Sequence, residues 1–91
     1  MSNRLATARD SRGCELRAVR ASGSPIVTVR GFPSPAGPLS WRKPSRPAME
    51  RLARAMLCDG ETLEPVSAGR AGDREDSPHV HTYRARRPRS V

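Results

Sequence analysis

The sequence predicts a predominantly disordered chain with one short amphipathic α-helix at about residues 47–58 and no globular core. Leu, Ile, Val and Phe number only 14 of the 91 residues, below the roughly 20% at which a strongly charged chain is expected to be disordered. The net charge is +8, and the three aromatic residues, Phe32, Trp41 and Tyr83, are far apart. Ordering a residue costs about 1.5 kcal/mol, while buried apolar surface contributes only about 25 cal/mol per Å². So few large side chains are not expected to offset that cost.

The composition divides the chain into four segments. Residues 1–46 form a basic Arg/Pro-rich segment, 47–58 the helix, 59–78 an acidic, Gly-containing linker, and 79–91 an Arg-rich disordered tail. Sixteen arginines stand against a single lysine, Lys43, and Ala, Gly and Pro are also frequent. Because these four frequent residue types have GC-rich codons, the base composition of the DNA explains the basicity about as well as a binding function does.

Residues 1–46 contain only weak structural signals. Leu5, Ala8, Leu16 and Val19 have a sparse helical spacing that Gly13 interrupts, so a helix is considered only within about residues 14–21. Residues 26–30 have the composition of a strand, but no second segment resembles a strand with which they could pair. Residues 31–47 contain five prolines and are predicted to be polyproline II or irregular linker. The whole segment is therefore expected to be extended and disordered.

Residues 47–58 have the pattern of an amphipathic helix. Pro47 suits the first turn, where its missing N–H is not needed, and Gly60 is a natural stop beyond the last turn. A helix of this length is marginal in water on its own, so it needs a partner. One hypothesis is therefore a helical interaction peptide that binds the groove of a partner protein. The predicted partner-binding face consists of Met49, Leu52, Met56 and Leu57.

Cysteine spacing and hydropathy indicate where the protein resides. Cys14 and Cys58 belong to no CxxC or zinc pattern and are predicted to be reduced thiols. No apolar run approaches the roughly 18 residues of a membrane helix, and no secretory signal is evident. We therefore expect an intracellular protein, nuclear or cytosolic, without membrane association. A mitochondrial presequence in residues 1–22 is an alternative, against which the acidic Asp10 and Glu15 count.

No pattern indicates catalysis, a cofactor or a metal site. His79 and His81 form an HxH pair that can hold a transition metal weakly, but a zinc site needs four ligands at a recognisable spacing. Ser, His and Asp are present without a scaffold that would assemble a triad, and there is no Gly-rich phosphate-binding loop. The sequence therefore predicts no enzyme, no cofactor and no metal site.

The Arg-rich tail is the strongest candidate for binding. Its guanidinium groups can pair with phosphates bidentately, a disordered tail can adapt to RNA, and the adjacent Tyr83 offers a stacking surface. Cations near the middle of the chain are expected to assist it. The residues predicted to contact RNA or other polyanions, non-specifically, are Arg42, Lys43, Arg46, Arg84, Arg86, Arg87 and Arg89.

Three hypotheses about function follow from these patterns. The first is that the chain is the product of a small GC-rich reading frame and has no defined biochemical activity. The second is an Arg-rich disordered peptide that associates with RNA or other polyanions. The third is the helical interaction peptide, whose protein partner the sequence does not identify.

Overall fold

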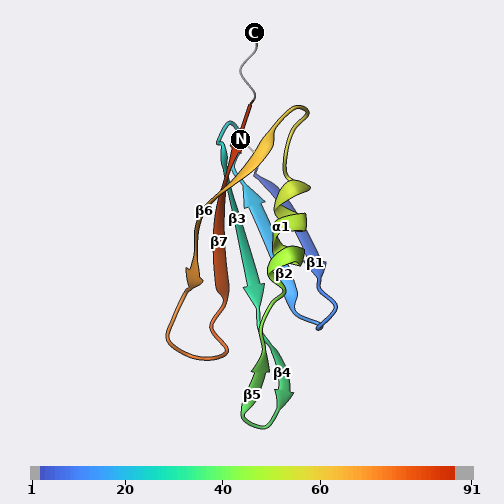
Figure 1. Ribbon diagram of the computed structural model, residues 1–91, viewed down its shortest axis with the longest axis vertical. Helices are drawn as coiled ribbons and strands as arrows, with labels where there is room; N and C mark the ends of the chain where they lie inside the picture. The colour runs from blue at the N-terminus through green and yellow to red at the C-terminus, as the bar shows by residue number, and fades with distance from the viewer. Residues whose placement is uncertain (1–2, 88–91) are drawn as a thin grey trace.

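A computed structural model describes residues 3–87, in which five strands form one antiparallel sheet (Figure 1). The strands lie in the order β1-β2-β3-β7-β6, and the helix α1 packs against one face of the sheet. A separate two-stranded hairpin, β4–β5, projects beyond the sheet at the lower end of Figure 1. The elements in chain order are β1 (Arg4–Arg9), β2 (Glu15–Arg20), β3 (Ile26–Phe32), β4 (Ser34–Gly37), β5 (Ser40–Arg42), α1 (Arg46–Arg54), β6 (Thr62–Arg70) and β7 (His79–Arg86).

The expectation of a disordered chain without a core is wrong, because a buried core joins α1 to the sheet. The count of Leu, Ile, Val and Phe leaves out Met, Ala and Tyr, and these residues fill much of the core. Small inward side chains such as Ala18 and Ala53 let the helix lie close to the strands, so few bulky residues are needed to fill the space between them. The core consists of Leu16, Ala18, Val27, Val29, Met49, Leu52, Ala53, Met56 and Tyr83.

Strand β2 alternates core residues with arginines. Leu16 and Ala18 are buried on the side that faces α1, and Arg17 between them is exposed on the opposite face. Strand β3 pairs with β2 so that Val29 lies opposite Ala18. The segment 14–21, in which the sequence indicated a weak helix, therefore mostly forms a strand. Its period-two alternation was inconspicuous because Ala is uncommon in strands.

The segments predicted as an acidic linker and a disordered tail form most of the other half of the sheet. Strand β7 is an interior strand that pairs with β3 on one side and with β6 on the other. Tyr83 and Ala85 of β7 are buried, whereas Arg84 between them is exposed. Strand β6 has an irregular register between Pro65 and Ser67, which accommodates the proline. Residues 26–30, expected only to be extended because no partner strand was evident, therefore belong to β3, which pairs with β7 residues that lie 48 to 58 positions further along the chain.

The carboxylate of Asp10 joins the β1–β2 turn to the start of α1. It accepts hydrogen bonds from the N–H groups of Arg12 and Cys14, both at 2.9 Å, and from the N–H of Ser45 at 2.7 Å. Ser45 is the N-cap of the helix. Burial alone would raise the pKa of Asp10, but these hydrogen bonds outweigh it and hold the pKa below its usual value. A local turn in the first third of the chain thus fixes where the helix begins.

Helix α1 begins one residue before the helix predicted at about 47–58 and ends earlier, at Arg54. Met49, Leu52 and Met56 are 1%, 8% and 2% exposed and pack against the sheet, while Leu57 is half-buried. The face predicted to bind a partner is therefore occupied by the protein's own sheet. It is not available to the groove of another protein, because exposing it would open the core.

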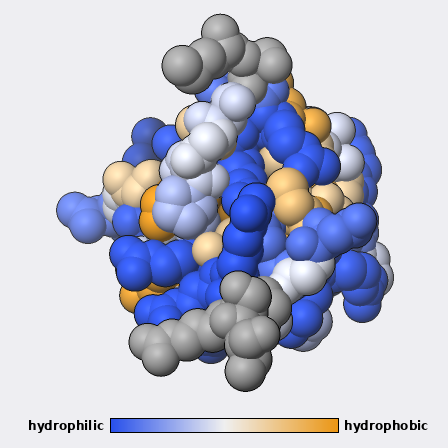
Figure 2. Space-filling view, turned by 90° about the horizontal axis from the view of Figure 1, so that it is seen from above, coloured by the Kyte–Doolittle hydropathy of each residue, from blue (hydrophilic) through white to orange (hydrophobic). Residues whose placement is uncertain are grey.

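The surface of the protein is mainly polar. In the view from above (Figure 2), the visible side is predominantly hydrophilic, and the hydrophobic residues lie in small separate areas. None of the helices within residues 3–87 is long and apolar enough to cross a membrane. The large apolar side chains that are exposed in this part of the chain are Leu5, Leu39, Trp41 and Val66.

Candidate nucleic-acid interface

The structure distributes the predicted RNA-binding cations over several surfaces. Arg84 and Arg86 project from the sheet face opposite to α1, where Arg86 pairs with Glu64. Arg42 lies on the projecting hairpin, and Arg87 is exposed just after β7. Arg89 lies outside the described residues. The arginines of the predicted tail that the structure describes therefore do not form a flexible basic segment, because Arg84 and Arg86 are part of strand β7. Tyr83 is only 5% exposed and cannot offer its ring for stacking.

Lys43 and Arg46, in contrast, lie beside an open groove. Helix α1 packs mainly over β3 and β2 and also contacts β1 and β6, and open cavities border the helix side of the sheet toward the end of β6 and the start of β7 (Figure 1). Two adjoining cavities of about 240 and 540 Å³ lie along this part of the sheet and share Arg46, Ala68 and His81 in their linings. We call this feature the basic groove, defined by Lys43, Arg46, Arg70, His79 and His81.

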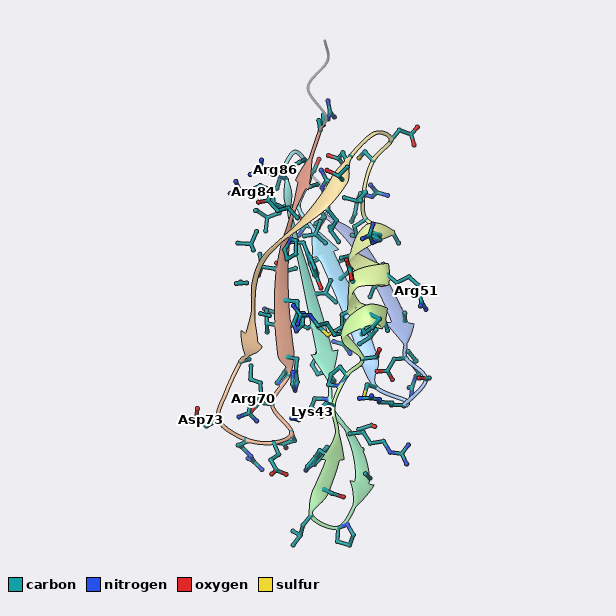
Figure 3. The ribbon with its side chains drawn as sticks, viewed as in Figure 1. Lys43, Arg51, Arg70, Asp73, Arg84 and Arg86 are labelled. Atoms are coloured by element: carbon teal, nitrogen blue, oxygen red, sulfur yellow. The ribbon has the colours of Figure 1, made fainter. Side chains whose placement is uncertain are left out.

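Three cations from three separate segments converge on the basic groove. Lys43 comes from the neck of the hairpin, Arg46 from the first turn of α1 and Arg70 from the end of β6. Figure 3 shows Lys43 and Arg70 near the same end of the sheet. Within residues 3–87, none of these three cations forms an ion pair. They are therefore free to bind an anion from solution.

A carboxylate also lines the groove, but it already has a partner. Glu50 pairs with Arg54 one helical turn further along α1, with 3.0 Å between Arg54 Nη2 and Glu50 Oε1. Arg70 donates a hydrogen bond of 3.4 Å to the carbonyl of Arg74, which leaves the rest of its guanidinium group unoccupied. The groove therefore keeps a net positive charge.

Two histidines lie on β7 at the floor of the groove. His79 and His81 point to the same side of the strand, because side chains two residues apart share a face. Burial lowers the pKa of both, and the positive charges of Arg70 and Lys43 lower that of His79 further. For His81 the further lowering comes from Arg46 and His79. Both imidazoles are therefore neutral at pH 7 and present flat, uncharged rings between the cations.

The histidines do not gather a metal-binding group around them. In the described part of the chain, no three residues among His, Cys, Asp and Glu come together at distances that would hold a metal ion. The hydroxyl of Tyr83 lies 3.4 Å from Nδ1 of His81 and orients that ring. The arrangement thus offers aromatic surfaces and hydrogen-bonding groups.

Sequence reasoning missed Arg70 as a member of this group. Arg70 belongs to the segment predicted as an acidic linker, and it was not among the cations predicted to contact RNA. The β6–β7 pairing instead places Arg70 opposite His79 and directs it toward Lys43 and Arg46. A partial signal existed, because β7 has an alternating pattern in which Tyr83 and Ala85 are buried and Arg84 is exposed, and it follows a Gly-containing turn after Arg70.

The uncovered face of the sheet is a second basic surface, but its charges are partly neutralised. The guanidinium of Arg17 lies over the ring of Phe32, 5.1 Å from its centre, and pairs with Glu15 at 3.1 Å. Arg86 on the same face pairs with Glu64. This face is therefore less suited to anions than the basic groove.

Comparison with known proteins gives no guide to the function. The chain matches no protein-family model, and no similar protein is found among curated proteins or among solved structures. The basic groove is therefore the feature that bears on function.

Proposed function

We propose that the protein binds single-stranded nucleic acid in the basic groove. The observation that carries this proposal is the convergence of Lys43, Arg46 and Arg70 around two neutral histidines, without an ion pair to any of the three within residues 3–87. Arginines bind phosphate through two parallel hydrogen bonds, and lysine binds it as a point charge. The groove therefore offers three cationic side chains that can bind successive phosphates of a nucleic-acid backbone.

The shape of the groove favours a single strand over a duplex. The larger of its two cavities has a volume of about 540 Å³, in the range of a small-molecule site, which suits a nucleotide and is too small for a double helix. The rings of His79 and His81 lie on its floor, where they can stack with unpaired bases. Stacking tolerates any base, so we expect little sequence specificity.

The salt dependence of binding tests how many cations are engaged. Each phosphate that a cation neutralises on a single strand changes the slope of log K against log salt concentration by about −0.7. Contacts from all three cations of the groove therefore predict a slope of about −2. This slope can be measured by fluorescence anisotropy with a short labelled oligonucleotide.

A charge-matched pair of variants separates the groove from general basicity. The variant that carries Arg46→Gln and Arg70→Gln should bind at least about tenfold more weakly, with a slope near −0.7. The control carries Arg9→Gln and Arg51→Gln, which remove the same charge from exposed positions outside the groove. The control should keep a slope close to that of the wild type. Equal losses in both variants would refute the proposal and would leave the hypothesis of a basic chain without defined activity.

A further inference from the structure

The β4–β5 hairpin is a projecting arm with an apolar tip. Its apex carries Leu39, which is 91% exposed, and Trp41 follows on β5 with 39% of its surface exposed. The hairpin extends from the lower end of the sheet in Figure 1, away from α1 and from the chain termini. Leu39 lies at the end of the arm and is not part of the core.

The base of this arm is held firmly. The guanidinium of Arg12 donates a hydrogen bond of 3.1 Å to the carbonyl of Lys43, and the hydroxyl of Ser34 donates one of 3.1 Å to the carbonyl of Arg12. The arm also contains Pro35 and Pro38, which restrict its backbone. The base of the hairpin is therefore joined to the β1–β2 turn, and its tip lies beyond the end of the sheet.

The side chains along the arm follow a definite order from the tip to the base. Trp41 lies opposite Pro35, and Arg42 lies opposite Ser34. At about 3.4 Å per residue, Trp41 is about 7 Å behind Leu39 and Arg42 about 10 Å behind it. Lys43 follows Arg42 directly, and residues 31–49 contain no acidic side chain.

This order matches the layers of a membrane surface. Leucine favours the hydrocarbon, tryptophan the interface between hydrocarbon and water, and Arg and Lys the anionic headgroups. Segments that lie in the interface bury their apolar groups by about 5–10 Å, which agrees with the spacing from Leu39 to Arg42. Pro35 and Pro38 have no N–H group, so fewer backbone donors must be desolvated as the tip enters.

We infer that the β4–β5 hairpin docks the protein on an anionic phospholipid surface. Leu39 enters the boundary of the acyl chains, Trp41 lies in the interface, and Arg42 and Lys43 bind the headgroups. The expectation of no membrane association was based on the absence of a spanning segment, which this mode of binding does not need. A wedge that enters nucleic acid would need cations beside Leu39, but the nearest in sequence is Arg42.

Fluorescence of the full chain tests this inference, because Trp41 is its only tryptophan. Vesicles of phosphatidylcholine with about 30% phosphatidylserine should shift the emission of Trp41 to shorter wavelength, and the protein should co-sediment with them. Vesicles of phosphatidylcholine alone should do so much less. Leu39→Asp should weaken binding to the anionic vesicles by at least about tenfold.

Leu5 supplies the matched control, since it is 72% exposed on β1 and lies outside the arm. Leu5→Asp should bind vesicles like the wild type, and circular dichroism checks that both variants are folded. Three results would overturn the inference: no binding to anionic vesicles, equal losses in the two variants, or a shift of Trp41 emission with an oligonucleotide but not with vesicles. This test and the test of the basic groove share no substituted residue, so one can fail without the other.

Discussion

Arg20 and Glu61 form a bidentate ion pair between the end of β2 and the segment that precedes β6. Nη1 of Arg20 lies 2.7 Å from Oε1 of Glu61, and Nη2 lies 2.9 Å from Oε2. The two side chains are only 11% and 4% exposed. Arg20 also donates hydrogen bonds to the carbonyls of Ser24 and Met56, and Glu61 accepts one from the N–H of Cys58. The pair therefore connects the β2–β3 turn, the end of the helical region and the start of β6.

This pair predicts how stability changes in acid. Hydrogen bonds from Arg20 and then from the N–H of Cys58 lower the pKa of Glu61 from 4.5 to about 2. The unfolded chain therefore takes up the proton more readily than the folded protein does. The stabilisation is complete above pH 4.5 and is lost as the pH falls from 4.5 to about 2. Glu61→Gln should lower the thermal midpoint at pH 7 by several degrees and flatten the pH profile in that range, as followed by circular dichroism.

Glu64 provides the comparison for that experiment. It pairs with Arg86, but the two side chains are 44% and 58% exposed, so the pair is screened by water. Glu64→Gln should change the midpoint much less than Glu61→Gln does. An equal decrease in both variants would show that the Arg20–Glu61 pair has no special role.

A glycine on β3 allows the chain to pass closely over the sheet as it enters α1. A Cβ atom at Gly31 would lie 2.6 Å from Cβ of Pro44 and 3.1 Å from Sδ of Met49. Gly31→Ala should therefore lower the free energy of unfolding by about 1–3 kcal/mol, measured by urea denaturation. Gly69→Ala is the control, because no atom lies within 4 Å of its added Cβ. The prediction fails if both variants unfold at the same urea concentration.

The two cysteines should differ sharply in reactivity. Both are free thiols; Cys14 is fully buried beside Ser34, and Cys58 is exposed. A thiol reagent should modify Cys58 rapidly in the native protein and reach Cys14 only after unfolding. Cys58→Ser should abolish the rapid phase, whereas Cys14→Ser should leave it. A disordered chain would expose both thiols at once, so simultaneous modification would contradict the fold.

The pH dependence of nucleic-acid binding should report on the histidines of the basic groove. Burial and the nearby cations lower the pKa of His79 and His81, so both rings stay neutral at pH 7. Affinity should be constant between about pH 8 and 7 and should rise below their ordinary pKa of 6.5, because protonation adds positive charge to the groove. His81→Gln should remove part of that rise in anisotropy titrations at constant salt.

The same titration needs a check on folding. A lowered histidine pKa means that protonation favours the unfolded chain, so the stability that the neutral rings contribute is present above pH 6.5 and decreases as the pH falls. Circular dichroism at each pH separates tighter binding from unfolding. Affinity that decreases in acid while the protein stays folded would contradict the assignment of these histidines to the binding site.

Local patterns predicted the elements whose signals lie within one segment. The helix was predicted from the spacing of Met49, Leu52 and Met56. Residues 26–30 had the composition of a strand, although they were expected to stay unpaired, and they form most of β3. Strands β2 and β7 were missed because arginines occupy several of their outward positions and alanines some of their inward positions, which resembles a solvated basic segment.

The candidate site shows the same limit. Lys43 and Arg46 were singled out as cations, but nothing in the sequence separated them from Arg84 and Arg86 or joined them to Arg70. The pairing of the strands distinguishes these two groups of cations. It directs Arg84 and Arg86 to the uncovered face and brings Arg70 opposite His79.

The sequence by itself determined the net charge of +8 and the approximate position of the helix. It also placed the only tryptophan, Trp41, after Pro35 and Pro38 and directly before Arg42 and Lys43. These properties are local, since a helix makes its hydrogen bonds within a few residues and charge is a sum over the chain. Only the tertiary structure decided that the chain has a core and that three remote cations share a groove. A strand has no stable conformation until a partner supplies its hydrogen bonds and buries one of its faces. The residues of β3 and β7 that pair with each other lie 48 to 58 positions apart in the sequence.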